Sequence, residues 1–572
     1  MNKVNAIFQR LNATRQTVPT CLDRVLAIPR QTLDPNGPEA TAMGEKWSKF
    51  FGAKGAALRP VQGMAFEVIA QRKTLLGFIG VGAGKTGICL LAGEAAGAKR
   101  PLVLAPPALV KQMTEDLKWW SDHFTFTPPR LVSYGKLSVM SGANILEEYQ
   151  PDLVISDEAH YLKRASSSRT KRFLRYFYDH PTAGFIGVSG SLTSSSLMEY
   201  HHLLSLSLRE NTPLPLSRHE LAQWAACIDA KGEPVKEDWS KVWGLVEWDN
   251  QGGFFDDPAF MTTTQKKERV RLAFQKRLLS CPGVVHTSTF SCGASLHLIP
   301  HTPTCQVIED SLKKLKATWC RPDGEELSEA SAMAATAKNI SVGFYYRWLW
   351  PDGVVDFDWL EARAEWSRQV RGLLTYRSRQ GLDSPALVEI YASEGNGSAA
   401  LQRAWAQWAP LKHRPQPPKE AVWLTEEVVD YAFRWLEKQT APAVLWYSSQ
   451  AVGDLLEAKG VQVHGAGSPP PSAPKVAASI QAHGTGRNLQ HYDTAFIIEP
   501  PSGGGVWEQL LGRHHRQGQR SDLVSFHFLF STEAQVKAIE TAMAQADYVE
   551  KSTGVRQRIT AARLIKPNQK GK

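Results

Sequence analysis

Short apolar runs alternate with longer mixed segments between about residues 58 and 208 of the chain. This alternation is typical of a parallel sheet whose strands are joined by helices. The continuous apolar runs are those in TLLGFIG, PLVLAPP, DLVISDE and GFIGVSG, and they are followed by Gly, Pro, Asp or Ser. Open α/β folds bind their ligands at the carboxyl edge of the sheet. We therefore expect the functional loops at that edge.

The same alternation returns near residue 427, with a predicted helix in EEVVDYAFRWLEKQ and predicted strands in AVLWYS, VQVHG, KVAASIQA and TAFIIEP. The segment between the two blocks lacks this rhythm, and its composition favours a mostly helical insertion. The expected organisation is an N-terminal extension (1–45), a first α/β lobe (46–208), the insertion (209–418), a second α/β lobe (419–550) and a basic C-terminal tail (551–572).

The composition is that of a folded protein and excludes disordered, collagen-like and coiled-coil classes, because 43% of the 572 residues are hydrophobic and 21% are charged. The net charge of +10 favours polyanionic partners without requiring one. Seven cysteines without a CxxC pair indicate reduced thiols. The start of the chain lacks the apolar core of a signal peptide, and the best apolar stretch is broken by Lys85 and Glu94. We expect a cytoplasmic protein without a membrane span.

A phosphate-binding loop is predicted in GVGAGKT, directly after an apolar strand. Gly80, Gly82 and Gly84 would let the backbone curl around a phosphate chain at a helix N-terminus. Lys85 would reach the β and γ phosphates, and the Thr86 hydroxyl would face Mg²⁺. The strict pattern has Gly where this chain has Ile79, so a plain strand-to-helix turn is the alternative.

Two adjacent carboxylates end the apolar strand in LVISDEAH. Such groups are costly to keep at the end of a buried strand unless they have partners or a function. Asp157 would hold Mg²⁺, and Glu158 would orient and deprotonate an attacking water. A polar strand end capped by acids is the alternative.

Two arginines fall on one face of a predicted helix in QLLGRHHRQGQ. Gln509, Arg513 and Arg516 are spaced i, i+4 and i+7. Arginines that reach a γ-phosphate from a second lobe stabilise the charge of the transition state. On a solvated face the same spacing would carry no function.

The order of these motifs resembles the superfamily two helicases and translocases, and within them the Swi/Snf-type DNA-dependent ATPases. The resemblance covers about residues 58–208 and 444–529. It implies two RecA-like parallel-sheet lobes that bind ATP and Mg²⁺ between them. In LRPVQ, Gln62 resembles the residue that binds the adenine edge. The segments VLAPPALVKQ and HGTGRNLQ resemble loops that contact nucleic acid, which assigns this role to Pro106, Lys111, Thr485, Gly486 and Asn488. Coupling between the two sites is implied for His160, Ser189, Ser191 and Gln509.

The resemblance implies an ATP-dependent DNA translocase, with duplex or forked DNA as the partner. The HRQGQ ending favours DNA over RNA, and single-stranded DNA stays open. A helicase that separates the strands of forked or branched DNA is one alternative, and a clamp that binds ATP without cycling is another. The family implies a monomer. Only about ten residues separate His464 from the strand near Lys475, so we expect a trimmed second lobe.

Three further features carry two interpretations each. The segment QKKERVRLAFQKR (265–277) would track a phosphate backbone or form a solvated helix face. The tryptophans between Trp348 and Trp366 would stack on bases, but their near-helical spacing favours a core. Residues 551–572 contain seven basic and no acidic side chains, which predicts either nucleic-acid contact or a solvated end.

Overall fold

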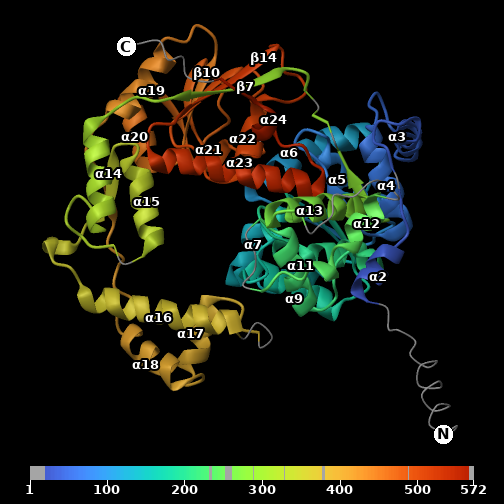
Figure 1. Ribbon diagram of the computed structural model, residues 1–572, viewed down its shortest axis with the longest axis horizontal. Coiled ribbons are helices and arrows are strands. Elements are labelled where there is room, and N and C mark those ends of the chain that lie inside the picture. Colours follow the sequence, from blue (N-terminus) through green and yellow to red (C-terminus); the bar gives the residue numbers. More distant parts are fainter. Residues whose placement is uncertain are drawn as a thin grey trace.

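The computed structural model describes residues 20–565, apart from 32, 231–234, 251–259, 288, 291, 328, 377–380 and 487. The protein is of the α/β class, with two all-parallel sheets of six and seven strands and helical segments between them (Figure 1). The predicted fold class is therefore confirmed. Among the described residues, no helix is both long and apolar enough to cross a membrane.

The first sheet has the strand order β3-β2-β4-β5-β1-β6. Its strands are β1 (Leu75–Phe78), β2 (Pro101–Ala105), β3 (Arg130–Ser133), β4 (Leu153–Asp157), β5 (Gly184–Ser189) and β6 (Val284–His286). The helices of this lobe up to residue 208 are α2 (Cys21–Ala27), α3 (Pro38–Phe50), α4 (Pro60–Arg72), α5 (Lys85–Ala95), α6 (Pro107–His123), α7 (Tyr134–Ser138), α8 (Ile145–Tyr149), α9 (Ser168–Asp179) and α10 (His201–Leu208). The four predicted strands of this lobe correspond to β1, β2, β4 and β5.

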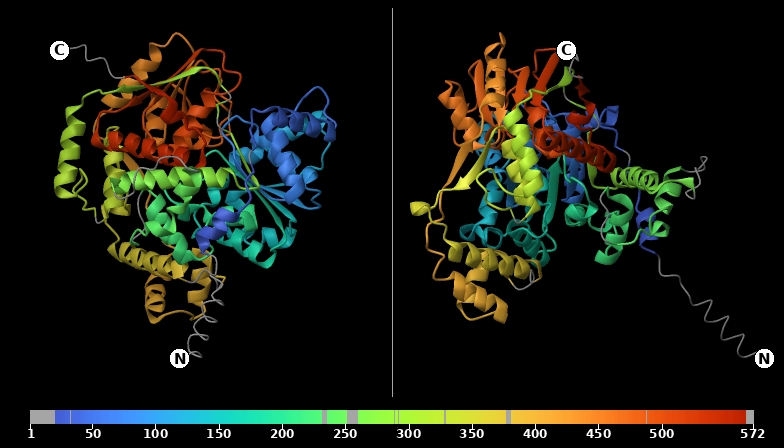
Figure 2. Two further views of the ribbon diagram at one scale, coloured as in Figure 1. Left: turned by 45° about the vertical axis from the view of Figure 1, so that its right-hand side comes forward. Right: turned by 60° about the vertical axis from the view of Figure 1, so that its left-hand side comes forward.

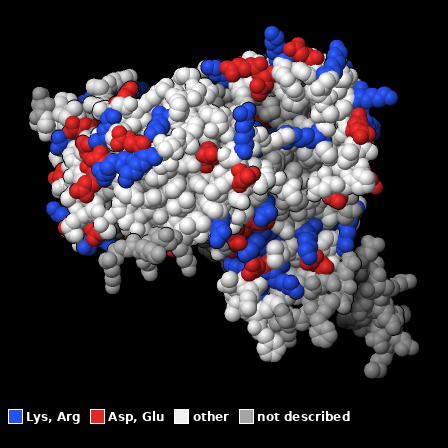
Figure 3. Space-filling view, turned by 90° about the horizontal axis from the view of Figure 1, so that it is seen from above, with Lys and Arg blue, Asp and Glu red and all other residues white. Residues whose placement is uncertain are grey.

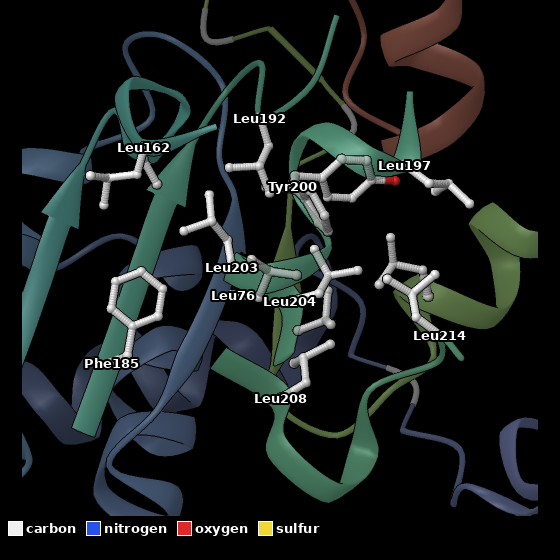
Figure 4. Packing of buried hydrophobic residues seen from close by; sticks show 14 of the residues in the cluster. Leu76, Leu162, Phe185, Leu192, Leu197, Tyr200, Leu203, Leu204, Leu208 and Leu214 are labelled. Atoms are coloured by element: carbon white, nitrogen blue, oxygen red, sulfur yellow. The ribbon is translucent and has the colours of Figure 1, made fainter. Parts of the chain in front are cut away.

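Both faces of the first sheet are buried. Successive side chains of a strand point to opposite faces, so neighbours in one strand belong to different apolar clusters. Leu76 and Phe185 belong to one apolar cluster, and their chain neighbours Leu75 and Ile186 belong to another. On the first face, α10 packs Leu203 and other leucines against the sheet (Figure 4). The continuous apolar runs of the sequence reflect this burial on two faces.

The second sheet has the order β11-β12-β10-β13-β14-β7-β15. Its strands are β7 (Ser295–His301), β10 (Ala443–Tyr447), β11 (Gln462–His464), β12 (Lys475–Ser479), β13 (Thr494–Ile497), β14 (Leu523–Leu529) and β15 (Arg563–Leu564). The helices that accompany it after residue 424 are α19 (Glu427–Glu437), α20 (Gln450–Ala458), α21 (Ile480–His483), α22 (Gly504–His514), α23 (Glu533–Thr553) and α24 (Arg558–Ala561). The predicted strands of this lobe correspond to β10, β11, β12 and β13.

The lobes extend into the segment 209–418 that the sequence assigns to an insertion. Strand β6 pairs with β1 of the first sheet, and β7 pairs with β14 of the second. Helices α11 (Arg218–Ile228), α12 (Gly244–Asn250) and α13 (Thr263–Leu279) belong with the first lobe, and α14 (Gln306–Thr318) and α15 (Ala330–Ile340) with the second. The predicted limits of the insertion, 209–418, are therefore too wide. The sequence does not reveal the two strands, because β6 has only three residues and β7 alternates between more and less buried positions, so neither is a continuous apolar run.

What remains of the insertion is a small helical unit on a two-stranded stem. The antiparallel strands β8 (Phe344–Trp348) and β9 (Lys419–Trp423) lead to α16 (Phe357–Tyr376), α17 (Pro385–Ser393) and α18 (Ala399–Trp408). This unit lies away from the second sheet (Figure 2). Trp366 is 6% exposed in its core and Trp359 is 3% exposed, which supports the interpretation of these tryptophans as packing residues.

The basic segment 265–277 lies in α13, and its arginines are used inside the protein. The Arg277 Nε donates to the carbonyl of Val25 at 2.9 Å, and the Arg271 Nε donates to that of Ile228 at 2.9 Å. Both arginines are buried. These two residues therefore fit neither a phosphate track nor a solvated face, and they hold α13 against neighbouring segments instead.

Candidate active site between the two sheets

Ten of the predicted site residues, from both lobes, line one pocket of about 180 Å³. The first lobe lines it with Arg59, Val81, Gly82, Gly84, Lys85, Thr86, Leu109, Gln112, Asp157 and Glu158, and the second with Gly486, Gln509, Arg513 and Arg516. A larger cavity of about 530 Å³ between α14, α15 and α23 has a mainly Leu, Ala and Met lining and contains none of the predicted residues. We identify the smaller pocket as the candidate site because it gathers the charged groups.

The phosphate loop takes the left-handed backbone that its glycines allow. Gly82 has a φ of 86° and Gly84 a φ of 94°, after which α5 begins at Lys85. The Lys85 ammonium donates to the carbonyl of Ile79 at 3.2 Å and pairs with a Glu158 oxygen at 3.1 Å. Gly80 does not line this pocket, and its N–H donates to the Thr287 hydroxyl at 2.9 Å. The loop thus presents Gly82, Gly84 and Lys85 to the pocket.

Gln62 is hydrogen-bonded to the main chain of this loop. Its Oε1 accepts from the Arg59 N–H at 2.8 Å, and its Nε2 donates to the Gly84 carbonyl at 3.0 Å. The side chain is buried, and a Cβ on Gly84 would lie 2.8 Å from its Nε2. Both ends of the amide are therefore bonded to main chain, and the base-reading role of Gln62 stays a prediction.

The two carboxylates stand at the end of β4 in different surroundings. Burial, and then the charge of Glu158, raises the pKa of Asp157 to about 7. Burial alone would raise the pKa of Glu158, but Lys85 and His160 hold it well below its usual range. Glu158 also has a φ of 52°, an uncommon backbone for a residue with a side chain. The pKa of Asp157 therefore lies above the usual range of a carboxyl group, and the pKa of Glu158 lies below it.

The predicted coupling residues converge on Glu158. The His160 Nδ1 lies 3.2 Å from Glu158 Oε2, and the Ser189 hydroxyl donates to the same oxygen at 3.4 Å. Ser191 is one step away, because its N–H donates to the Ser189 hydroxyl at 3.2 Å. From the second lobe, the Gln509 Nε2 donates to Glu158 Oε1 at 3.1 Å.

The two predicted arginines reach the pocket in different ways. Arg513 is buried in α22, where its Nη2 donates to Gln509 Oε1 at 2.8 Å. Burial, and then the charge of Arg516, lowers the pKa of Arg513 to about 9. Arg516 lies beyond the end of α22 at His514, so the predicted single helix face is wrong for this residue. It still lines the same pocket, and its Nη1 donates to Asn488 Oδ1.

The predicted nucleic-acid residues are only partly grouped. Gly486 lines the pocket, and a Cβ there would lie 2.8 Å from Leu109 of α6. The Asn488 Oδ1 accepts a hydrogen bond from Arg516, and Thr485 is half-buried. Pro106 is buried as the N-cap of α6, and Lys111 is exposed on that helix. On the face in Figure 3, Lys and Arg are interspersed with Asp and Glu instead of forming one positive patch. The DNA-contact roles stay predictions.

Two arginines of the site were missed from the sequence. Arg59 donates from Nη1 to the Gly82 carbonyl at 2.6 Å and from Nη2 to Gln517 of the second lobe. Its position in LRPVQ, directly before Pro60, was the available signal. Arg558 bonds to the Val81 carbonyl at 3.2 Å, and no local pattern marks it.

The residues present fit a magnesium polyphosphate. Four cations line the pocket, namely Lys85, Arg59, Arg513 and Arg516, against the carboxylates of Asp157 and Glu158. This excess of positive charge suits a phosphate chain, and the oxygens of Asp157 and Thr86 are the hard ligands that Mg²⁺ takes.

No protein-family model matches the chain, and no curated protein is similar to it at a significant level. The motif resemblance therefore has no support from similarity over the whole sequence, and the functional argument rests on the geometry of the pocket.

Proposed function

We propose that the protein is an ATP-dependent DNA translocase that hydrolyses ATP between its two lobes. The observation that carries this proposal is the Gln509–Glu158 hydrogen bond, which brings the helix of Arg513 to the carboxylate and to Lys85. A protein that only bound ATP would have no use for an ionised carboxylate at the end of β4 that is bonded by the second lobe.

Each group has a place in phosphoryl transfer to water. Lys85 and the phosphate loop bind the β and γ phosphates. Thr86 and Asp157 would hold Mg²⁺, which supplies positive charge beside the phosphates when bound. Glu158 orients the attacking water and accepts its proton, and Arg513 and Arg516 stabilise the charge of the transferred phosphoryl group. The products are ADP and inorganic phosphate.

Movement along DNA would follow from the division of the site between two lobes. ATP favours the arrangement in which both lobes contact the phosphates, and loss of the γ-phosphate removes part of that contact. If the loops at Lys111 and Thr485 grip one DNA backbone, this cycle becomes a step along the strand.

The test is steady-state ATP hydrolysis without nucleic acid and with single-stranded DNA, duplex DNA, forked DNA or RNA. We expect stimulation by duplex or forked DNA, and loss of turnover in Lys85→Ala and Arg516→Ala with DNA binding retained. Arg520→Ala is the matched control, because this arginine is exposed four residues further on. Normal turnover in either site variant, or no hydrolysis with any polymer, would overturn the proposal. Displacement of a triplex strand against unwinding of a fork then separates translocation from strand separation.

A further inference from the structure

The chain after α23 crosses back from the second lobe to the first. It turns at Gly554, which has a φ of 72°, and then forms α24 and β15. Val555 packs in a core cluster of the first lobe, whereas Ile559 packs in a cluster of the second. Figure 1 shows α23 running beside the second sheet toward the first lobe. Residues 555–559 therefore belong to both lobes, and the predicted limit of a basic tail at 551 is wrong for this segment.

Within this crossing, Arg558 contacts Val81, a residue that lines the candidate pocket. It is 1% exposed, and its Nη1 forms an ion pair with Glu508, which is equally buried. Its Nε donates to the carbonyl of His515 at 3.2 Å, and its Nη2 donates to the carbonyl of Val81 at 3.2 Å. One guanidinium thus bonds to α22, to the segment after α22 and to the phosphate loop.

The bond to Val81 fixes a peptide unit in the wall of the pocket. In a trans peptide the C=O and the following N–H point in opposite directions. When Arg558 holds the Val81 carbonyl, the N–H of Gly82 is directed away from Arg558. Val81 and Gly82 both line the pocket, so the bond fixes the orientation of a peptide unit in the pocket wall. The matching bond from Arg59 to the Gly82 carbonyl fixes the next peptide.

The bond to Glu508 holds α22, the helix from which the second lobe lines the pocket with Gln509 and Arg513. Glu508 directly precedes Gln509 on α22, the helix that also carries Arg513. Its carboxylate accepts from the Arg558 N–H at 2.6 Å in addition to the ion pair. Separating a buried carboxylate from its buried cationic partner is costly, so the Glu508–Arg558 pair resists displacement of α22.

We propose that Arg558 is a positioning residue of the nucleotide site, which sets the phosphate loop and the arginine-bearing helix α22 in register across the two lobes. The inference rests on the proposed function, since it assumes that the pocket binds a nucleotide. Arg558 touches no reacting group and acts through the Val81 carbonyl and through Glu508.

The decisive variant is Arg558→Lys, which keeps a positive charge for Glu508 but lacks the planar fork that reaches Val81 and His515 at once. Loss of a hydrogen bond of about 0.5–1.5 kcal/mol predicts a dissociation constant for ATP that is about 2- to 10-fold higher. Hydrogen exchange of the amides in residues 80–84 is expected to be faster without nucleotide. Arg556→Gln is the matched control, because Arg556 is exposed two residues away.

The measurements are made below the onset of thermal unfolding of each variant, so that a role in stability alone changes the melting temperature but neither the ATP affinity nor the loop exchange. Wild-type affinity and exchange in R558K would overturn the inference. If R558K does not fold, the double variant E508Q/R558Q removes both buried charges together and is measured in the same way. If the wild type binds no ATP, the proposed function fails, while the exchange of residues 80–84 still decides whether Arg558 orders the loop.

Discussion

Gln509 of α22 donates a hydrogen bond to Glu158 at the end of β4, with 3.1 Å between Nε2 and Oε1. Both side chains are buried, and 351 positions of the chain separate them. The same Glu158 oxygen pairs with Lys85 at 3.1 Å. The orientation of the carboxylate therefore depends on both lobes.

Gln509→Ala is expected to lower the turnover of ATP about 10- to 100-fold, because the carboxylate loses its second-lobe partner and is oriented by the first lobe alone. ATP affinity should change less than about 3-fold, since Gln509 does not hold the phosphate loop. Steady-state kinetics and equilibrium ATP binding measure the two quantities. Gln481→Ala, at an exposed position of α21, is the control. An unchanged turnover number would show that the inter-lobe bond does not orient Glu158.

The sequence predicts strands best where burial is local and continuous. β1, β2, β4 and β5 are buried at every position and mostly apolar, because helices cover both faces of their sheet, and this pattern is visible in the sequence of each strand alone. β7 and β14 pair side by side in the second sheet, but Ser295 and Leu523 are far apart in sequence and both strands alternate in burial. No local pattern identifies such a pair.

The residues of the candidate site likewise fall into those that a local motif predicts and those that only the tertiary structure reveals. Lys85 and Glu158 were assigned to one site from separate motifs, and they lie 3.1 Å apart. Each motif carries its own chemistry in a few adjacent residues. Arg558 has no motif, and its relation to Glu508 and Val81 arises only when the chain folds back after α23. Contacts of this kind need the tertiary structure.

Asp383→Ala is expected to loosen the helical unit from the first lobe. The Asp383 carboxylate pairs with Arg172 of α9 at 2.8 Å and with Arg175 at 3.1 Å, and Asp383 and Arg172 are no more than 2% exposed. Removing one partner leaves a buried charge without compensation, which typically costs about 3–5 kcal/mol. The midpoint of urea unfolding, followed through tryptophan fluorescence, measures the loss.

The control for this pair is Asp310→Ala, because Asp310 and Lys313 form an exposed ion pair on α14. Exposed pairs contribute little, so we expect an unchanged midpoint. Equal effects of the two substitutions would show that the Asp383 pair does not attach the unit.

Two glycine substitutions are expected to have opposite effects on stability. A Cβ on Gly63 of α4 would lie 2.3 Å from the Gly44 nitrogen, so Gly63→Ala forces α3 and α4 apart and should destabilise the fold by about 1–3 kcal/mol. A Cβ on Gly372 of α16 would meet nothing within 4 Å, and Gly372→Ala should stabilise by about 0.5–1 kcal/mol through reduced chain entropy. Melting temperatures of the two variants test the pair, and a rise in Gly63→Ala would contradict the close helix contact.

Asp229 joins the two lobes at a further point, and it is not among the residues that line the candidate pocket. It follows α11 of the first lobe and accepts from the Tyr548 hydroxyl of α23 at 2.7 Å and from the Leu197 N–H at 3.0 Å. Burial raises its pKa to about 6, although the hydrogen bonds from Ser196 and Tyr548 and the charge of Arg271 oppose the rise.

This raised pKa predicts the sign of a pH dependence. A carboxyl group whose pKa is higher in the folded than in the unfolded protein binds its proton more tightly when folded. Its contribution to stability is therefore complete below about pH 4 and is lost as the pH rises through about 6. A shift of about two pKa units corresponds to roughly 3 kcal/mol. Asp229→Asn cannot titrate, so the difference in unfolding free energy between wild type and variant should move in favour of the variant between pH 4 and pH 7. A constant difference across this range would show that Asp229 does not change its protonation on folding.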